Sequence, residues 1–283
     1  MSVPGAFDVL TGSEKFCELS AEVRLEYVEQ GPADGEPVVF LHGVTDSWHS
    51  FERILPLLPP ALHAFAISQR GHGDSSRRQS RYLFKDFSED LLLFVNAMGL
   101  HKVTLVGHSM GASVAQRFVI DHPDRVSAVV LMGAFAGIAE DPGVREFFNS
   151  AIAPLTDPIA PEFARDWQLT TLAREMDPAH FETVVAETLK VPARVWKTAF
   201  EGFLSTPDFT GELRKVSVPV LIMWGDRDTY AVRAAQNRLL EVMPHARFLA
   251  YEGVGHALHW EDPVRCTADL VTFLAEHLQM AKP

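Results

Sequence analysis

The chain has 283 residues, 47% of them hydrophobic, which is enough for one large α/β domain with a full core. Its formal net charge of −12 provides no basic surface for nucleic acid or for an anionic membrane, so we expect neither as a partner. The start of the chain lacks an apolar signal-peptide core, and no stretch reaches the roughly 18 apolar residues of a membrane span. We therefore expect a soluble, cytoplasmic protein.

Eight segments show the apolar pattern of β-strands. The second alternates apolar and polar residues, and the third, residues 38–41, is an unbroken apolar run typical of a buried central strand. Most of these runs are bounded by Gly, Pro or Asp, which favour turns. In chain order the predicted strands are residues 15–20, 23–29, 38–41, 63–67, 103–106, 126–132, 218–224 and 247–251.

Helical patterns lie between many of these strands. Apolar residues recur every three or four positions in residues 84–98, 112–120, 234–242 and 267–278. Alternating strands and helices predict a mostly parallel sheet with helices on both faces. The sequence therefore places this chain in the α/β class.

The alternation stops between residues 134 and 215, where no segment reads as a buried strand. Aromatic residues at helical spacing and a high proline content predict several short helices joined by turns. We expect residues 134–215 to form a helical cap inserted into a core made of residues 1–133 and 216–283.

A five-residue turn, Gly107-His108-Ser109-Met110-Gly111, matches the pattern G-x-S-x-G. A predicted strand precedes the turn and a predicted helix follows it, which is the context this motif requires. Glycines on both sides leave room for a sharp turn that exposes the serine hydroxyl at a helix N-terminus, where negative charge is favoured. The alternative is an ordinary glycine-rich turn in which Ser109 caps the helix.

A serine nucleophile needs a base, and the base needs an orienting carboxylate. Asp226 and Asp228 follow one predicted strand, and His256 and His259 follow the next. The chain order of these groups is therefore Ser, Asp, His. The spacing alone leaves both acids and both histidines as candidates.

These motifs together resemble the α/β-hydrolase superfamily over nearly the whole chain. The similar pieces are His42-Gly43, Arg70-Gly71-His72-Gly73-Asp74-Ser75, Gly225-Asp226-Arg227-Asp228 and Gly253-Val254-Gly255-His256. The resemblance implies an α/β-hydrolase fold with Ser109 as nucleophile, His256 as general base and then acid, and Asp228 as the orienting acid.

The same resemblance assigns supporting roles. The backbone N–H groups of Val44 and Met110 would form the oxyanion hole. The second acid of such a loop is usually the catalytic one, so Asp226 would brace the loop. His256 follows the Gly-Val-Gly turn and is favoured over His259.

A serine at position 109 excludes the branches of the superfamily that attack with an aspartate. We expect acyl transfer through an acyl-enzyme, with a small-molecule ester or lactone as substrate and with no cofactor or metal. The alternatives on this scaffold are a carbon–carbon bond hydrolase, an amidase or a cofactor-free perhydrolase. A ligand receptor that has lost catalysis is a further alternative.

The predicted cap should cover the carboxyl ends of the strands and shape the specificity. Four aromatic residues are candidates for a substrate pocket: Trp48, Phe135, Trp167 and Trp196. For each of them, packing against the cap or the core is the alternative.

Overall fold

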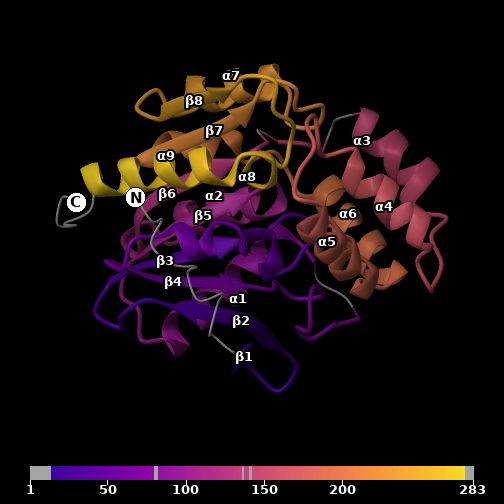
Figure 1. Cartoon of the computed structure of the whole chain (residues 1–283), viewed down its shortest axis with the longest axis horizontal. Helices are drawn as coiled ribbons and strands as arrows, with labels where there is room; N and C mark the ends of the chain where they lie inside the picture. Colours follow the sequence, from indigo (N-terminus) through magenta and orange to yellow (C-terminus); the bar gives the residue numbers. More distant parts are fainter. Residues whose placement is uncertain (1–13, 80–81, 136, 140–141, 278–283) are drawn as a thin grey trace, which may run out of the picture.

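The computed structural model describes residues 14–79, 82–135, 137–139 and 142–277, and within these it contains a single eight-stranded sheet (Figure 1). The strand order is β1-β2-β4-β3-β5-β6-β7-β8; the pairs β1–β2 and β2–β4 are antiparallel and all others are parallel. All eight predicted strands are confirmed: β1 Lys15–Glu18, β2 Arg24–Gln30, β3 Glu36–Leu41, β4 Leu62–Ile67, β5 Val103–His108, β6 Val126–Met132, β7 Val220–Gly225 and β8 Arg247–Tyr251.

Helices cover both faces of this sheet, and β3 shows why its apolar run is unbroken. Val39 and Leu41 pack into the core cluster that contains apolar residues of α1 (Phe84–Ala97) and α2 (Met110–Asp121). Val38 and Phe40 point the other way, into the cluster that contains residues of α9 (Pro263–His277). Successive side chains of a strand face opposite sides, so a strand covered on both sides must be apolar throughout.

The four helices predicted between the strands are confirmed as α1, α2, α7 (Arg233–Val242) and α9. Residues 1–13, which the sequence assigns to the core, and Leu278, at the end of the predicted last helix, lie outside the described residues. Shorter elements complete the sheet-covering layers: η1 Trp48–Phe51, η2 Leu55–Leu57, η3 Pro123–Arg125, η5 Thr210–Lys215 and α8 Leu258–Glu261.

Between β6 and β7 the chain forms a group of helices on one side of the sheet, at the right of Figure 1. This helical segment, residues 142–205, comprises α3 Pro142–Phe147, the π-helical turn η4 Phe148–Ile152, α4 Pro161–Leu169, α5 Pro178–Lys190 and α6 Ala193–Ser205. Proline stands at the first position of α3, α4 and α5, where its missing N–H breaks no helical hydrogen bond. The prolines therefore divide the segment into short helices, as the sequence predicts.

Three loops bring the candidate site together. Ser109 directly follows β5, while Asp228 and His256 follow β7 and β8 within a few residues. Because these strands are parallel neighbours in the order β5-β6-β7-β8, their carboxyl ends open at the same edge of the sheet. Among the described residues, no helix is long and apolar enough to cross a bilayer.

Candidate active site

Ser109 lies in a backbone turn that only close packing can hold. Its φ of 53° and ψ of −115° fall in a region that side-chain-bearing residues rarely adopt. A Cβ on Gly107 would lie 2.4 Å from the Gly111 carbonyl oxygen, and a Cβ on Gly111 would lie 2.0 Å from that of Leu41. Both positions therefore require glycine, which explains the spacing of the motif.

Asp228 and His256 form a hydrogen-bonded pair, with 2.8 Å between Asp228 Oδ2 and His256 Nδ1. The other carboxylate oxygen, Oδ1, accepts the N–H groups of Tyr230 and Ala231, at 2.8 Å each. Burial alone would raise the pKa of Asp228, but the His256 ring and the two N–H groups outweigh it and lower the pKa. The carboxylate is therefore ionised at neutral pH and holds the imidazole through Nδ1–H.

The two rival residues make other contacts. Asp226 Oδ1 accepts the Gly253 N–H at 2.6 Å and so joins the loop after β7 to the loop after β8. His259 is fully buried, with Nε2 3.0 Å from Ser50 Oγ, and burial holds its pKa well below the usual range. The structure thus pairs Asp228 with His256 and directs Asp226 and His259 elsewhere.

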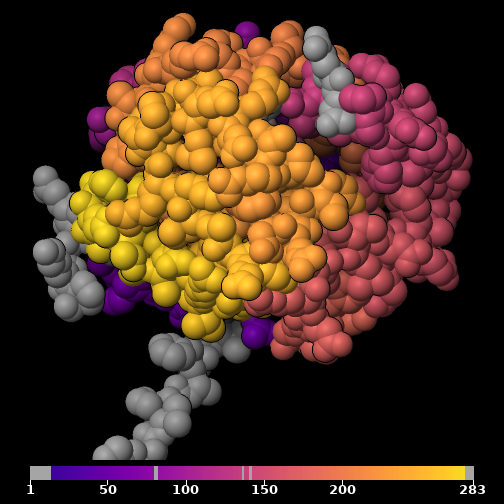
Figure 2. All heavy atoms as spheres, turned by 90° about the horizontal axis from the view of Figure 1, so that it is seen from above, coloured from indigo at the N-terminus to yellow at the C-terminus, as the bar shows by residue number. Residues whose placement is uncertain are grey.

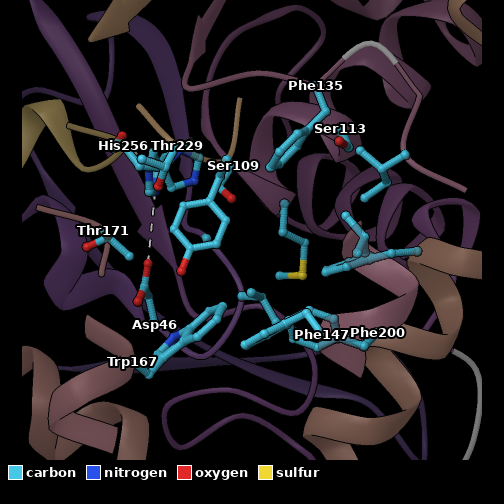
Figure 3. A pocket seen from close by; sticks show the side chains of 18 of the residues that line it. Asp46, Ser109, Ser113, Phe135, Phe147, Trp167, Thr171, Phe200, Thr229 and His256 are labelled. Carbon is cyan, nitrogen blue, oxygen red and sulfur yellow. Dashed lines mark hydrogen bonds and ion pairs between the residues drawn. The ribbon is translucent and has the colours of Figure 1, made fainter. Parts of the chain in front are cut away.

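Ser109 and His256 both line a cavity of about 330 Å³ between the strand ends and the helical segment (Figure 3). Val44 and Met110 line it too, and within the described residues neither of their N–H groups donates to a backbone acceptor. Much of the remaining wall is aromatic: Phe84, Phe135, Phe147, Trp167, Phe200 and Phe203.

Two of the four predicted pocket residues, Phe135 and Trp167, line this cavity, and two do not. Trp48 is buried in the α9-side core cluster, where its ring stacks on His49 with 3.8 Å between centroids. Trp196 is fully buried behind Trp167 and packs edge-on against it, at a centroid distance of 5.4 Å. The prediction was wrong for Trp196 because helical spacing does not say which neighbour an aromatic ring will face. It was wrong for Trp48 because a position a few residues beyond Val44 does not fix the direction of the side chain.

The sequence analysis missed Asp46, which lies on the cavity wall below Ser109 in Figure 3. The residue is 4% exposed, and its Oδ1 accepts a hydrogen bond from Gln168 Nε2 at 3.0 Å. Burial raises the pKa of Asp46 to about 7, against the lowering effect of Gln168 and His256. The sequence offered one signal for Asp46, namely that it is an acid four residues after His42 in the loop that follows β3.

His42 holds that loop in place through both ring nitrogens. Nδ1 lies 2.6 Å from the Gly43 carbonyl oxygen, to which it must donate, so Nε2 accepts the Gln69 N–H, at 2.8 Å. Burial keeps the pKa of His42 well below its usual value, which leaves the ring neutral. The loop that carries Val44 is thus tied to the loop after β4.

The helical segment is hydrogen-bonded directly to the loop that carries His256. The Thr171 carbonyl oxygen accepts the N–H groups of His256 at 2.8 Å and of Ala257 at 3.1 Å. Glu261 Oε1 accepts the N–H groups of Ala173 at 3.0 Å and of Gly255 at 2.9 Å. Figure 2 shows this part of the segment packed against the C-terminal part of the chain.

Residues 36–263 match the family model described as the alpha/beta hydrolase fold, which is most of the chain. The protein therefore belongs to this family. The fold expected from the sequence motifs is confirmed.

Proteins to which this chain is similar carry different activities in their names. The chain is 26% identical over 279 residues to the non-heme chloroperoxidase CPO-A1 of Kitasatospora aureofaciens, covering 91% of this chain and 98% of that protein. It superimposes on the crystal structure of a membrane phospholipase A with a TM-score of 0.85 at 22% identity, covering 97% of this chain and 89% of that one. For the esterase RhEst1 of Rhodococcus sp. ECU1013 the TM-score is 0.80 at 23% identity, covering 94% and 100% of the two chains.

Proposed function

We propose that the protein is a serine hydrolase that cleaves a carboxylic ester or a lactone through an acyl-enzyme on Ser109. The observation that carries this proposal is that Ser109 and His256 line one cavity of about 330 Å³ and that Asp228 is hydrogen-bonded to His256 behind it. The structural similarity to an esterase supports it as well.

In this mechanism His256 acts as the proton carrier. Because Asp228 accepts the Nδ1–H, the lone pair of the neutral ring is on Nε2, which takes the proton of the Ser109 hydroxyl as its oxygen attacks the carbonyl carbon. The proton is then given to the leaving alcohol. Water repeats the sequence on the acyl-enzyme and frees the acid.

The oxyanion formed in each step needs donors that are already in place. We assign this role to the N–H groups of Val44 and Met110, two residues that both line the cavity. Met110 is the first residue of α2, so the helix N-terminus also favours the negative charge.

We assign specificity to residues 134–215 as a cap. Four aromatic residues of this region, Phe135, Phe147, Trp167 and Phe200, line the cavity. Apolar walls of this kind favour an aromatic or aliphatic group on the substrate.

The test uses a fluorophosphonate probe and a panel of p-nitrophenyl esters, lactones and amides across chain lengths. The native protein should be labelled once, and Ser109→Ala should lose labelling and lose about 10³-fold or more of its turnover. Labelling that persists in Ser109→Ala would reassign the nucleophile. Hydrolysis of amides alone would replace the ester assignment with an amidase, and tight binding without turnover would indicate a receptor.

A second candidate is favoured by the relative named a non-heme chloroperoxidase. Hydrogen peroxide can take the place of water on the acyl-enzyme, and the product is then a peracid, which oxidises halide without a cofactor. Halogenation of monochlorodimedone that needs acetate, peroxide and an intact Ser109 would support this perhydrolase activity.

A further inference from the structure

The loop that carries Val44 contains a residue in an unfavourable backbone conformation. Asp46 donates its N–H to the Gly43 carbonyl oxygen at 3.3 Å, which closes a turn of residues 43–46. Thr45, the third residue of this turn, has a φ of 72°, a region in which glycine is favoured and a β-branched residue is an outlier. Such a conformation persists only where the surrounding structure holds it.

A hydrogen bond from the helical segment holds Thr45. Its side chain is fully buried, and Oγ1 accepts the Nε1–H of Trp167, in α4, at 2.9 Å. The next residue of α4, Gln168, donates from Nε2 to Asp46 Oδ1. Trp167 and Asp46 both line the cavity and are labelled in Figure 3. Two successive residues of α4 are thus bonded to the two residues that follow Val44.

The Trp167 ring is fixed by aromatic neighbours, so its N–H has a set direction. The ring stacks on Phe147 at a centroid distance of 5.6 Å and meets Trp196 edge-on at 5.4 Å. Tyr230, from the loop after β7, also lies edge-on to it, at 5.9 Å. A ring packed among other rings has few alternative rotamers, because close-packed neighbours leave no space for them. The indole is therefore a rigid donor to Thr45.

The conformation of Thr45 matters for its neighbour Val44. Peptide bonds are planar, so Thr45 cannot return to negative φ without turning the peptide unit that it shares with Val44. The Val44 N–H would then leave the place at the cavity that we assign to it. An oxyanion-hole donor has to lie about 3 Å from the oxyanion, and a displacement of about 1 Å can cost about a hundredfold in rate.

We propose that Trp167 is a positioning residue for catalysis: its indole N–H holds Thr45 at positive φ and thereby keeps the Val44 N–H aimed at the oxyanion. This inference rests on the proposed function, which assigns Val44 to the oxyanion hole. Trp167 then has two roles, because its ring is also part of the apolar wall. The alternative is that the bond only docks the helical segment on the core, which predicts lower stability without a selective loss of kcat.

The experiment compares Trp167→Phe, which removes the donor, with Thr45→Val, which removes the acceptor. Steady-state kinetics on p-nitrophenyl butyrate gives kcat and KM. Each variant should lose about tenfold or more in kcat while KM changes by less than about threefold, because the oxyanion forms only after the substrate has bound. The double variant Trp167→Phe/Thr45→Val should lose no more than the weaker of the two single variants, since both changes break the same bond.

Two substitutions in the helical segment are matched controls. Trp196→Phe makes the same change on the neighbouring ring, whose Nε1 has no hydrogen-bond partner among the described residues. Thr198→Val removes a hydroxyl that donates to the Arg194 carbonyl oxygen within α6. Both controls should keep kcat within about threefold of the native value.

Amide hydrogen exchange gives a second reading, which needs no turnover. The peptide that carries residues 43–47 includes the Asp46 N–H that closes the turn. Its exchange should rise about fivefold or more in Trp167→Phe and in Thr45→Val, as expected for the loss of one hydrogen bond, and should stay unchanged in the two controls.

Native kcat in Trp167→Phe would overturn the positioning role, and so would an equal loss of kcat in Trp196→Phe. A double variant that loses the product of the two single losses would overturn it as well. If the native protein hydrolyses no ester, the proposed function fails. Exchange that rises only in Trp167→Phe and Thr45→Val would then still support the hold of Trp167 on the loop, and unchanged exchange would overturn that hold too.

Discussion

Two regions contribute to the cavity, the loops at the carboxyl ends of β5, β7 and β8 (the strand-end loops) and the helical segment. They are constrained in different ways. In the loops, backbone atoms lie so close together that Gly107, Gly111 and Gly225 leave no room for a Cβ, which at Gly225 would lie 2.2 Å from the Gly255 carbonyl oxygen. In the helical segment, side-chain rings define the wall, and their size decides what fits. The comparison teaches that the proposed chemistry depends on backbone geometry, whereas the proposed specificity depends on side-chain volume.

The largest effect on activity should come from Asp228, in the strand-end loop that follows β7. Asp228→Asn removes the acceptor that holds the His256 Nδ1–H, so kcat should fall about 10³–10⁴-fold. Asp226→Asn changes only a bond between two loops and should cost less than about tenfold. Steady-state kinetics on one p-nitrophenyl ester decides the ranking, and the opposite order would assign the catalytic acid to Asp226.

A second test concerns the packing of the turn around Ser109. Gly111→Ala would bring a Cβ to 2.0 Å from the Leu41 carbonyl oxygen, so we expect a loss of more than about 3 kcal/mol in the free energy of unfolding or failure to fold. Gly211→Ala is the control, because its nearest atom, on the Arg214 side chain, is 3.5 Å away. Urea unfolding of both variants gives the comparison, and equal stability would contradict tight packing at position 111.

The free energy of unfolding should depend on pH through Asp46, which lies where the two regions meet. Its pKa is about 7 in the folded protein against an ordinary value of 3.8, so the folded state holds the proton over this range while the unfolded chain has lost it. Stability therefore falls as pH rises from about 4 to 7, by up to about 1.4 kcal/mol per pH unit from this group. Urea unfolding across this range should show that slope reduced in Asp46→Asn; an unchanged slope would contradict the buried, protonated carboxyl.

The smallest effect should come from the apolar wall. Phe203→Ala enlarges the cavity near Phe84, so the substrate chain length with the highest kcat/KM should become longer. Each further methylene that is buried contributes about 0.8 kcal/mol, which raises kcat/KM about fourfold. Phe163→Ala, which removes a ring packed against Trp196 away from the cavity, is the matched control. An optimum that shifts equally in both variants would argue against Phe203 as part of the substrate pocket.

The fold was predictable because its signals are periodic. The unbroken apolar run of β3 follows from its burial on both faces, and the stripe of α1 from its single buried face. The tight turn around Ser109 was recognisable because the close approach at Gly107 and Gly111 restricts the residue type at both positions.

The cavity was less predictable because its contacts depend on tertiary packing. Trp167 and Trp196 occur on neighbouring amphipathic helices, yet only Trp167 faces the cavity. The bonds from Thr171 to the His256 loop use a backbone carbonyl, which any residue supplies, and so leave no trace in the sequence. Asp46 resembles an ordinary loop acid until Gln168, more than a hundred residues later, is seen to bind it.

The bonds at Thr171 also matter for protein engineering. Exchanging the helical segment between homologous enzymes is an obvious way to transplant specificity, with residues 142–205 as the unit to be swapped. Thr171 and Arg174, however, are hydrogen-bonded directly to the loop that carries His256. Ala173 donates to Glu261 of α8, whose carboxylate also accepts the Gly255 N–H of that loop. A chimera that keeps residues 171–174 with their native loop, and exchanges the helices around them, leaves the histidine's support intact.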